Sequence, residues 1–218
     1  MKVGTDGILL GAWADVNNVD TVLDIGTGTG LIALMIAQRK PNSKITAIDI
    51  DVSSCLQAKE NVLLSPWNDI IKIENITFQD YSPASTLKYD LIITNPPFFI
   101  NSKKAPVKER AIARHADTLS HDDILKGSRN LLNKNGKLSL ILPFDGYDCF
   151  AAKATEFGFF EERRMIVYPT PEKAPVRILS QWILNKPNCL ITEKIVIEKY
   201  GRHNYSEEYI KLTEDFYL

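Results

Sequence analysis

Short apolar runs alternate with amphipathic stretches over the first two thirds of the chain. Thr21–Ile25 and Tyr89–Thr94 are compact runs rich in β-branched residues, and segments of helical length separate such runs. Near-continuous apolar runs are typical of strands covered on both faces, and their spacing predicts βαβ units with a mostly parallel sheet. The strands predicted on this basis are 21–25, 44–50, 70–76, 89–94 and 137–142.

Amphipathic spacing and end signals predict helices between these strands. Ser120 is a suitable N-cap for one of them, Ser53 or Ser54 lies at the start of another, and Asn135-Gly136 predicts a turn. Beyond Pro143 the pattern changes to strands separated by turns, which predicts an antiparallel C-terminal edge. The predicted helices are 31–39, 52–64, 120–132, 146–157 and 206–213, and the later strands are 164–168, 176–184 and 191–199.

The composition narrows the class of protein without specifying an activity. The chain has 218 residues, of which 44% are hydrophobic, so we expect one domain spanning residues 1–218. The net charge of −1 favours neither a membrane surface nor a generic nucleic-acid binder. Three widely spaced cysteines predict reduced thiols and no metal site. Without a signal peptide or an apolar run of membrane-spanning length, we expect a cytoplasmic protein.

A glycine-rich loop follows the first predicted strand. Gly26, Gly28 and Gly30 form a GxGxG spacing, and Asp24 stands two residues before it. Glycines allow a sharp turn and a close approach to a ligand, and the following helix N-terminus offers free N–H groups. Dinucleotide sites use GxGxxG around a pyrophosphate. A carboxylate beside the loop suits a cationic ligand instead, such as the sulfonium and amino-acid end of S-adenosylmethionine.

Acidic residues also end the second and third predicted strands. Asp49 follows Asp24 by 25 positions, close to the spacing at which an acid binds ribose hydroxyls in nucleotide-binding folds. Asp51 is its competitor and ranks second. Asp80, after the third strand, is a candidate acceptor for the adenine amine of a cofactor, the alternative being a solvated loop acid.

The most specific motif directly follows the fourth strand, where Asn95, Pro96, Pro97 and Phe98 stand in a row. Prolines fix φ and remove N–H donors, so the Asn95 amide oxygen and the Pro96 carbonyl are free to bind both hydrogens of a primary amine. Such binding directs the nitrogen lone pair towards a methyl donor, and Phe98 can stack on a planar group. The alternative is a proline-stiffened turn.

A basic segment follows this tetrapeptide. Residues 101–115 carry five basic side chains against the single acid Glu109. Placed at the rim of the site, they could contact phosphates that flank a target base, the alternative being a solvated basic loop. The five basic residues are Lys103, Lys104, Lys108, Arg110 and Arg114.

These motifs resemble the NPP[FY] class of S-adenosylmethionine-dependent methyltransferases. Within it the chain is most similar, essentially end to end, to bacterial tRNA (adenine-N6)-methyltransferases that modify the adenosine 3′ of the anticodon in a valine tRNA. The resemblance implies an α/β Rossmann-like class I methyltransferase fold, with a mostly parallel seven-stranded sheet and helices on both faces. It also implies S-adenosylmethionine as cofactor and tRNA as partner, and leaves protein partners open.

The resemblance also implies roles for individual residues. Thr5, Asp6 and Asp24 would line the methionine end of the cofactor, Asp49 would bind the ribose, and Asp80 the adenine. The glycines would shape the loop, and the tetrapeptide would hold the target base. One departure concerns the N-terminus: family members usually carry a strand-forming segment before the KVGTDG motif, whereas this sequence begins beside it. We therefore expect that segment to be lacking.

The residues alone leave other methyl acceptors and other functions open. A guanine amine in ribosomal RNA, a DNA adenine or a release-factor glutamine presents the same planar NH₂ group. A non-catalytic RNA-binding module with a methyltransferase fold is a different class, disfavoured by the intact acids and tetrapeptide. A nicotinamide oxidoreductase is disfavoured by the GxGxG spacing.

Overall fold

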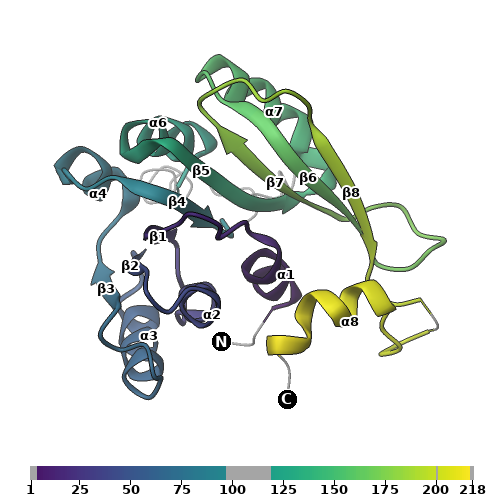
Figure 1. Ribbon diagram of the computed structural model, residues 1–218, viewed down its shortest axis with the longest axis horizontal. Helices are drawn as coiled ribbons and strands as arrows, with labels where there is room; N and C mark the ends of the chain where they lie inside the picture. Colours follow the sequence, from purple (N-terminus) through teal and green to yellow (C-terminus); the bar gives the residue numbers. More distant parts are fainter. Residues whose placement is uncertain (1–3, 97–118, 200, 217–218) are drawn as a thin grey trace, which may run out of the picture.

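A computed structural model describes residues 4–96, 119–199 and 201–216 of the chain (Figure 1). The first part contains α1 (Thr5–Trp13), β1 (Thr21–Ile25), α2 (Leu31–Arg39), β2 (Lys44–Asp49), α3 (Val52–Leu63), β3 (Ile71–Asn75), α4 (Phe78–Ala84) and β4 (Tyr89–Thr94). The second contains α6 (His121–Leu131), β5 (Leu132–Pro143), η1 (Phe144–Gly146), α7 (Tyr147–Glu156), β6 (Phe160–Tyr168), β7 (Arg177–Ile183), β8 (Ile191–Val196), α8 (Glu207–Thr213) and η2 (Glu214–Phe216).

The strands form one sheet in the order β3-β2-β1-β4-β5-β7-β6-β8. Every strand predicted from the apolar runs falls on one of these strands, and the α/β fold with a mostly parallel sheet is confirmed. The sheet has eight strands, one more than the resemblance implied. The antiparallel edge is also narrower than expected: β7 runs antiparallel to β5 and β6, but β8 pairs parallel with β6. The chain reverses its direction after β7 and places β8 on the far side of β6, so β8 runs the same way as β6.

Helices cover both faces of the sheet, as expected (Figure 1). One core cluster joins α1, α2, α3 and α8 to one face, with Trp13, Ile36 and Tyr209 among its buried side chains. The other joins α4, α6 and α7 to the opposite face, with Phe150 and Trp182 at its centre. In the described ranges, no helix is long and apolar enough to span a membrane.

Helix α1 was not predicted, because its apolar residues surround it instead of forming one stripe: seven of its nine residues are buried. It packs along α2, and its glycines permit the close approach. A Cβ added to Gly7 would lie 3.2 Å from Leu31 Cδ2, and one added to Gly11 would lie 2.7 Å from Met35 Sδ. The second contact lies four residues further along both helices than the first. The two helices α1 and α2 therefore run parallel, with their N-termini side by side.

Helix α6 begins as predicted, with Ser120 as its N-cap in a capping box with Asp123. The turn predicted at Asn135-Gly136 lies instead inside β5, where the register slips: Tyr89 pairs with Leu132, but Leu91 pairs with Lys137. The intervening residues loop out as a bulge, so the strand resumes beside β4 after the interruption.

Gly136 is the position where this bulge tolerates no side chain, and Gly136→Ala is expected to lower the unfolding free energy by roughly 2 kcal/mol. The added Cβ would lie 2.7 Å from the Tyr89 carbonyl oxygen and 3.0 Å from the Asn133 nitrogen, so backbone would have to move. Urea denaturation checks the value. The matched control is Gly146→Ala, where a Cβ meets nothing within 4 Å. Equal stability of the two variants would contradict the packing argument.

Candidate active site

The predicted site residues that the structure describes gather at the carboxyl edge of the parallel strands. Ile25, the last residue of β1, pairs with Ile48 on one side and Thr94 on the other. The glycine loop, Asp49 and Asn95 therefore leave neighbouring strands at one level. The chain order reverses between β1 and β4, because β2 and β3 lie on one side and β5 on the other. Ligands of open α/β sheets bind at such a reversal.

The glycine loop has the backbone that its sequence requires. Gly26, Gly28 and Gly30 have φ values of +70°, +58° and +83°, a region that residues with a Cβ rarely adopt. The N–H groups of Gly26 and Thr27 both donate to the carbonyl of Ile48 at 2.9 and 3.0 Å, which fixes the loop to β2. A Cβ on Gly26 would meet nothing within 4 Å, so the backbone here borders open space.

Asp24 is fully buried in β1, beneath this loop. Its Oδ2 accepts a hydrogen bond from Thr27 Oγ1 at 2.6 Å, while Oδ1 has no partner of hydrogen-bonding geometry within the described residues. Burial raises the pKa of the Asp24 carboxyl to about 7 and the charge of Asp49 adds to the rise, whereas the Thr27 hydroxyl and the Ala33 amide oppose it. An unpartnered buried acceptor beside an open loop fits a ligand that brings a donor or a positive charge.

Asp49 ends β2 and braces the loop. Its Oδ2 accepts from the N–H of Gly28 at 2.7 Å, and its Oδ1 from that of Asp51 at 2.9 Å. Each carboxylate oxygen has a second lone pair, so the group keeps capacity for a diol. Asp51 lies outside β2 and caps α3 by accepting from the Ser54 N–H at 2.7 Å. Its capping role leaves Asp49 the better placed of the two acids for a ribose.

Asn75 was missed by the sequence analysis. It ends β3 opposite Asp49, and its Nδ2 donates to the carbonyls of Asp49 and Ile50 at 3.0 and 2.9 Å. The side chain thereby fixes the turn that carries Asp49. A polar residue at a strand end was the only signal in the sequence, and its partner could be identified only once β2 and β3 were known to be neighbours.

Asp80 follows β3, as predicted, and it lies in the first turn of α4 instead of in the loop that the alternative assumed. Thr77 is the N-cap of this helix, and its hydroxyl donates to Asp80 Oδ2 at 2.7 Å while accepting from the Asp80 N–H at 3.0 Å. The carboxylate is exposed beyond the end of β3, on the same edge as Asp49.

Thr5 and Asp6 form the first turn of α1, next to the glycine loop because α1 and α2 run parallel. Thr5 is exposed, and Asp6 is half-buried in an ion pair with Arg177 on β7, where Arg177 Nε donates to Asp6 Oδ2 at 2.8 Å. The sequence offered no signal for this pair, whose members are 171 positions apart.

Asn95 directly follows β4 and is half-buried, and Pro96 is buried. The hydroxyl of Thr94 donates to the Ile25 carbonyl at 2.8 Å and fixes the end of β4 to that of β1. Asn95 is therefore held beside the start of the glycine loop. Pro97, Phe98 and the basic residues of segment 101–115 lie outside the described residues.

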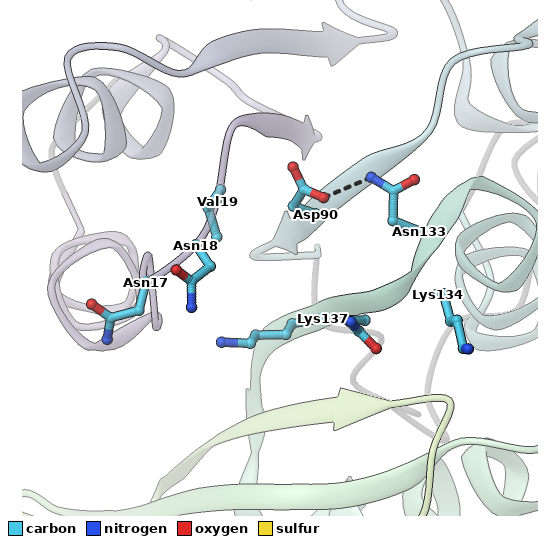
Figure 2. A pocket seen from close by; sticks show the side chains of 8 residues that line it. Asn17, Asn18, Val19, Asp90, Asn133, Lys134 and Lys137 are labelled. Carbon is cyan, nitrogen blue, oxygen red and sulfur yellow. Dashed lines mark hydrogen bonds between the residues drawn. The ribbon is translucent and has the colours of Figure 1, made fainter.

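Two surface hollows lie on the opposite, amino edge of the sheet. The larger, of about 490 Å³, is polar (Figure 2). Asp90 and Asn133 face each other in it, with Asn133 Nδ2 donating to Asp90 Oδ1 at 2.6 Å. Its lining residues are Asn17, Asn18, Val19, Asp90, Asn133, Lys134, Asn135 and Lys137. None of the predicted site residues that the structure describes lines either hollow.

Comparison with known proteins gives concordant matches. Residues 5–143 match the family described as "Methyltransferase small domain". The chain is 44% identical over 219 residues to the tRNA1(Val) (adenine(37)-N6)-methyltransferase of Bacteroides fragilis, and 45% identical over 220 residues to the protein of that name from Trichodesmium erythraeum. Each alignment covers 100% of this chain and 91% of the relative.

Solved structures share the fold. A protein from Agrobacterium tumefaciens, described as a "predicted O-methyltransferase", superposes with a TM-score of 0.68 over 96% of both chains. Its sequence identity of 16% makes this a likeness of fold alone.

Proposed function

Because this chain belongs to the tRNA1(Val) (adenine(37)-N6)-methyltransferase family, we propose that it methylates the N6 amine of adenine 37 in a valine tRNA. S-Adenosylmethionine, when bound, supplies an electrophilic methyl group on its sulfonium. The observation that carries the proposal is the position of Asn95 and Pro96 directly after β4, beside the glycine loop and across the reversal of strand order. The end-to-end similarity to the curated relatives supports the choice of acceptor.

Several residues are proposed to hold the cofactor. The unpartnered Oδ1 of Asp24 is a suitable acceptor for the methionine ammonium, with Thr5 and Asp6 beside it. Asp49 would accept from the ribose hydroxyls, and Asp80 from the adenine amine. Gly26, where an added Cβ would meet nothing within 4 Å, leaves open space for a close approach of the backbone, and Gly28 and Gly30 would shape the loop.

Asn95 and Pro96 are proposed to bind the target amine. The Asn95 side-chain carbonyl and the Pro96 main-chain carbonyl would each accept one N–H of the adenine N6 group, which directs the nitrogen lone pair out of the base plane. Pro97 would stiffen the turn, and Phe98 would stack on the base. Positioning of this kind supplies most of the acceleration in an in-line displacement, so no strong base is required. The target adenine has to be unpaired or flipped to reach these groups.

We also propose that the chain forms one domain and acts in the cytoplasm, where its tRNA substrate is found. Within the described residues, no group of three or more His, Cys, Asp and Glu side chains is placed to hold a metal ion.

The test is transfer of labelled methyl from S-adenosylmethionine to total RNA from a bacterium that lacks the corresponding enzyme, followed by nucleoside analysis. The expected product is N6-methyladenosine, confined to the valine tRNA fraction. Label in guanosine, in DNA or in a release factor would show that adenine in tRNA is not the acceptor, although the protein would still be a methyltransferase. Absence of label from every acceptor, with RNA still bound, would favour the non-catalytic module.

The basic segment is proposed to bind phosphates around the target base. Replacing Lys103, Lys104 and Lys108 by glutamine is expected to reduce the slope of log K against log salt concentration by roughly two to three. Filter binding of the valine tRNA between 50 and 200 mM salt measures the slope. The control replaces Lys186, Lys194 and Lys211, which the proposal does not place at the RNA. An unchanged slope in the variant of Lys103, Lys104 and Lys108 would show that these side chains do not contact the RNA phosphates.

A further inference from the structure

One ion pair links the two sides of the candidate active site. Arg177 Nε donates to Asp6 Oδ2 at 2.8 Å, and the side chains are about one quarter exposed, at 30% and 23% respectively. The Nη1 of Arg177 also donates to the Val176 carbonyl at 2.9 Å. The guanidinium is therefore held by its own strand while it orients the Asp6 carboxylate.

Asp6 stands on the cofactor side of the site. Gly7 contacts the Leu31 side chain and Gly11 the Met35 side chain, so the first turn of α1 lies next to the first turn of α2. That turn of α2 begins at Gly30, the last glycine of the loop. The carboxylate of Asp6 thus joins those of Asp24, Asp49 and Asp80 at this edge of the sheet.

Arg177 stands on the other side, where β5 and β7 extend beyond β4. Leu140 of β5 pairs with Thr94, the last residue of β4, and β5 then continues to Pro143, which pairs with Arg177. Three further residues span roughly 10 Å, so the β5–β7 pair forms a wall past the point where Asn95 leaves β4. The ion pair therefore connects Arg177, in the β5–β7 wall, to Asp6, in the first turn of α1 next to the glycine loop.

A second arginine holds the other end of α1. Arg163 Nε donates to Glu193 Oε2 at 2.6 Å, its Nη1 donates to the Trp13 carbonyl at 3.3 Å, and its guanidinium lies 4.6 Å from the Trp13 ring centroid. This end of α1 lies at the amino edge of the sheet, away from the site. Partly exposed ion pairs contribute little to folding, so the two arginines differ mainly in what they position.

We propose that Arg177 is a positioning residue for the cofactor: it fixes Asp6 against the β5–β7 wall and thereby sets the affinity of the methionine end. The proposal rests on the proposed function, because Asp6 is assigned to the cofactor there. Arg177 holds the Asp6 carboxylate in one orientation, and the guanidinium compensates the negative charge that Asp6 adds to those of Asp24 and Asp49. Without Arg177, the Asp6 side chain would be mobile, and it would have to become ordered when the ligand binds.

The test is calorimetric titration of S-adenosylhomocysteine, the demethylated product, into the purified chain. Arg177→Gln is expected to raise its Kd about tenfold, and Arg177→Lys, which keeps the charge, by less. In kinetics, the KM for S-adenosylmethionine should rise by a similar factor while kcat stays within twofold. In an Asp6→Asn background the same Arg177→Gln change should have little effect, because the two residues act as one unit.

Arg163→Gln is the matched control, and it should leave the Kd within twofold although α1 loses a comparable contact. Equal loss of affinity in this control, an unchanged Kd in Arg177→Gln, or additive effects of the Asp6 and Arg177 changes would each overturn the inference. The wild-type titration separates it from the proposed function. If the wild type does not bind S-adenosylhomocysteine, the proposed function fails. If the wild type binds it and Arg177→Gln binds it equally tightly, only the inference about Arg177 fails.

Discussion

Asn95→Ala is expected to lower the rate of methyl transfer by roughly 10³-fold or more while the Kd for S-adenosylhomocysteine stays within a few-fold. The variant removes one of the two proposed acceptors for the adenine amine but leaves the glycine loop, Asp24 and Asp49 intact. The nitrogen lone pair would then no longer be directed at the methyl donor. Single-turnover transfer to the valine tRNA measures the rate, and titration of the product measures the affinity.

The matched control for this prediction is Asn17→Ala. Asn17 is an exposed asparagine that lines the polar hollow at the amino edge of the sheet, away from the site (Figure 2). The Asn17→Ala variant should therefore transfer methyl at the wild-type rate. Turnover of Asn95→Ala at the wild-type rate would remove Asn95 from the site, and a parallel loss of cofactor affinity would place it at the cofactor instead.

Asp24→Asn is expected to weaken S-adenosylhomocysteine binding by roughly 100-fold, the effect of losing one charged hydrogen bond of about 2–3 kcal/mol. The same variant should be more stable than the wild type at pH 8 when no ligand is present. The carboxylate is fully buried with one unpartnered oxygen, so its charge opposes folding until a ligand compensates it.

The pH dependence follows from the raised pKa of Asp24. The carboxyl has an ordinary pKa of 3.8 and a pKa of about 7 in the fold, so between these values the folded chain keeps a proton that the unfolded chain has lost. The unfolding free energy therefore falls as pH rises through this window, by about 3 kcal/mol between pH 5 and pH 8. This fall should be absent from Asp24→Asn in urea denaturation at the two pH values.

Ligand affinity should move in the opposite direction, because the ionised carboxylate is the form that accepts a cationic ligand. The affinity of the wild type for S-adenosylhomocysteine should fall about tenfold from pH 8 to pH 6, whereas that of Asp24→Asn should change little. Asp148→Asn, which removes an exposed acid on α7, is the control and should keep the wild-type dependence. A wild-type affinity independent of pH would show that Asp24 does not bind the charged end of the ligand.

The sequence by itself determined the features that depend on near neighbours in the chain. Near-continuous apolar runs marked β1, β4 and the later part of β5, because strands buried on both faces need apolar side chains at successive positions. Ser120 marked the start of α6 because a cap and its N–H partner are three residues apart. The GxGxG spacing marked a loop whose positive φ values only glycine adopts readily, and the resemblance carried by these motifs was confirmed by the relatives.

Other features depend on contacts between distant residues, so only the tertiary structure decided them. Helix α1 is buried on nearly all sides by α2, α8 and the sheet, so its sequence shows no amphipathic period. Asn75 acquires a role only when β3 lies beside β2, and Arg177 only when β7 lies past the end of β4. The raised pKa of Asp24 likewise comes from burial under the loop, a property of packing that the identity of the residue cannot reveal.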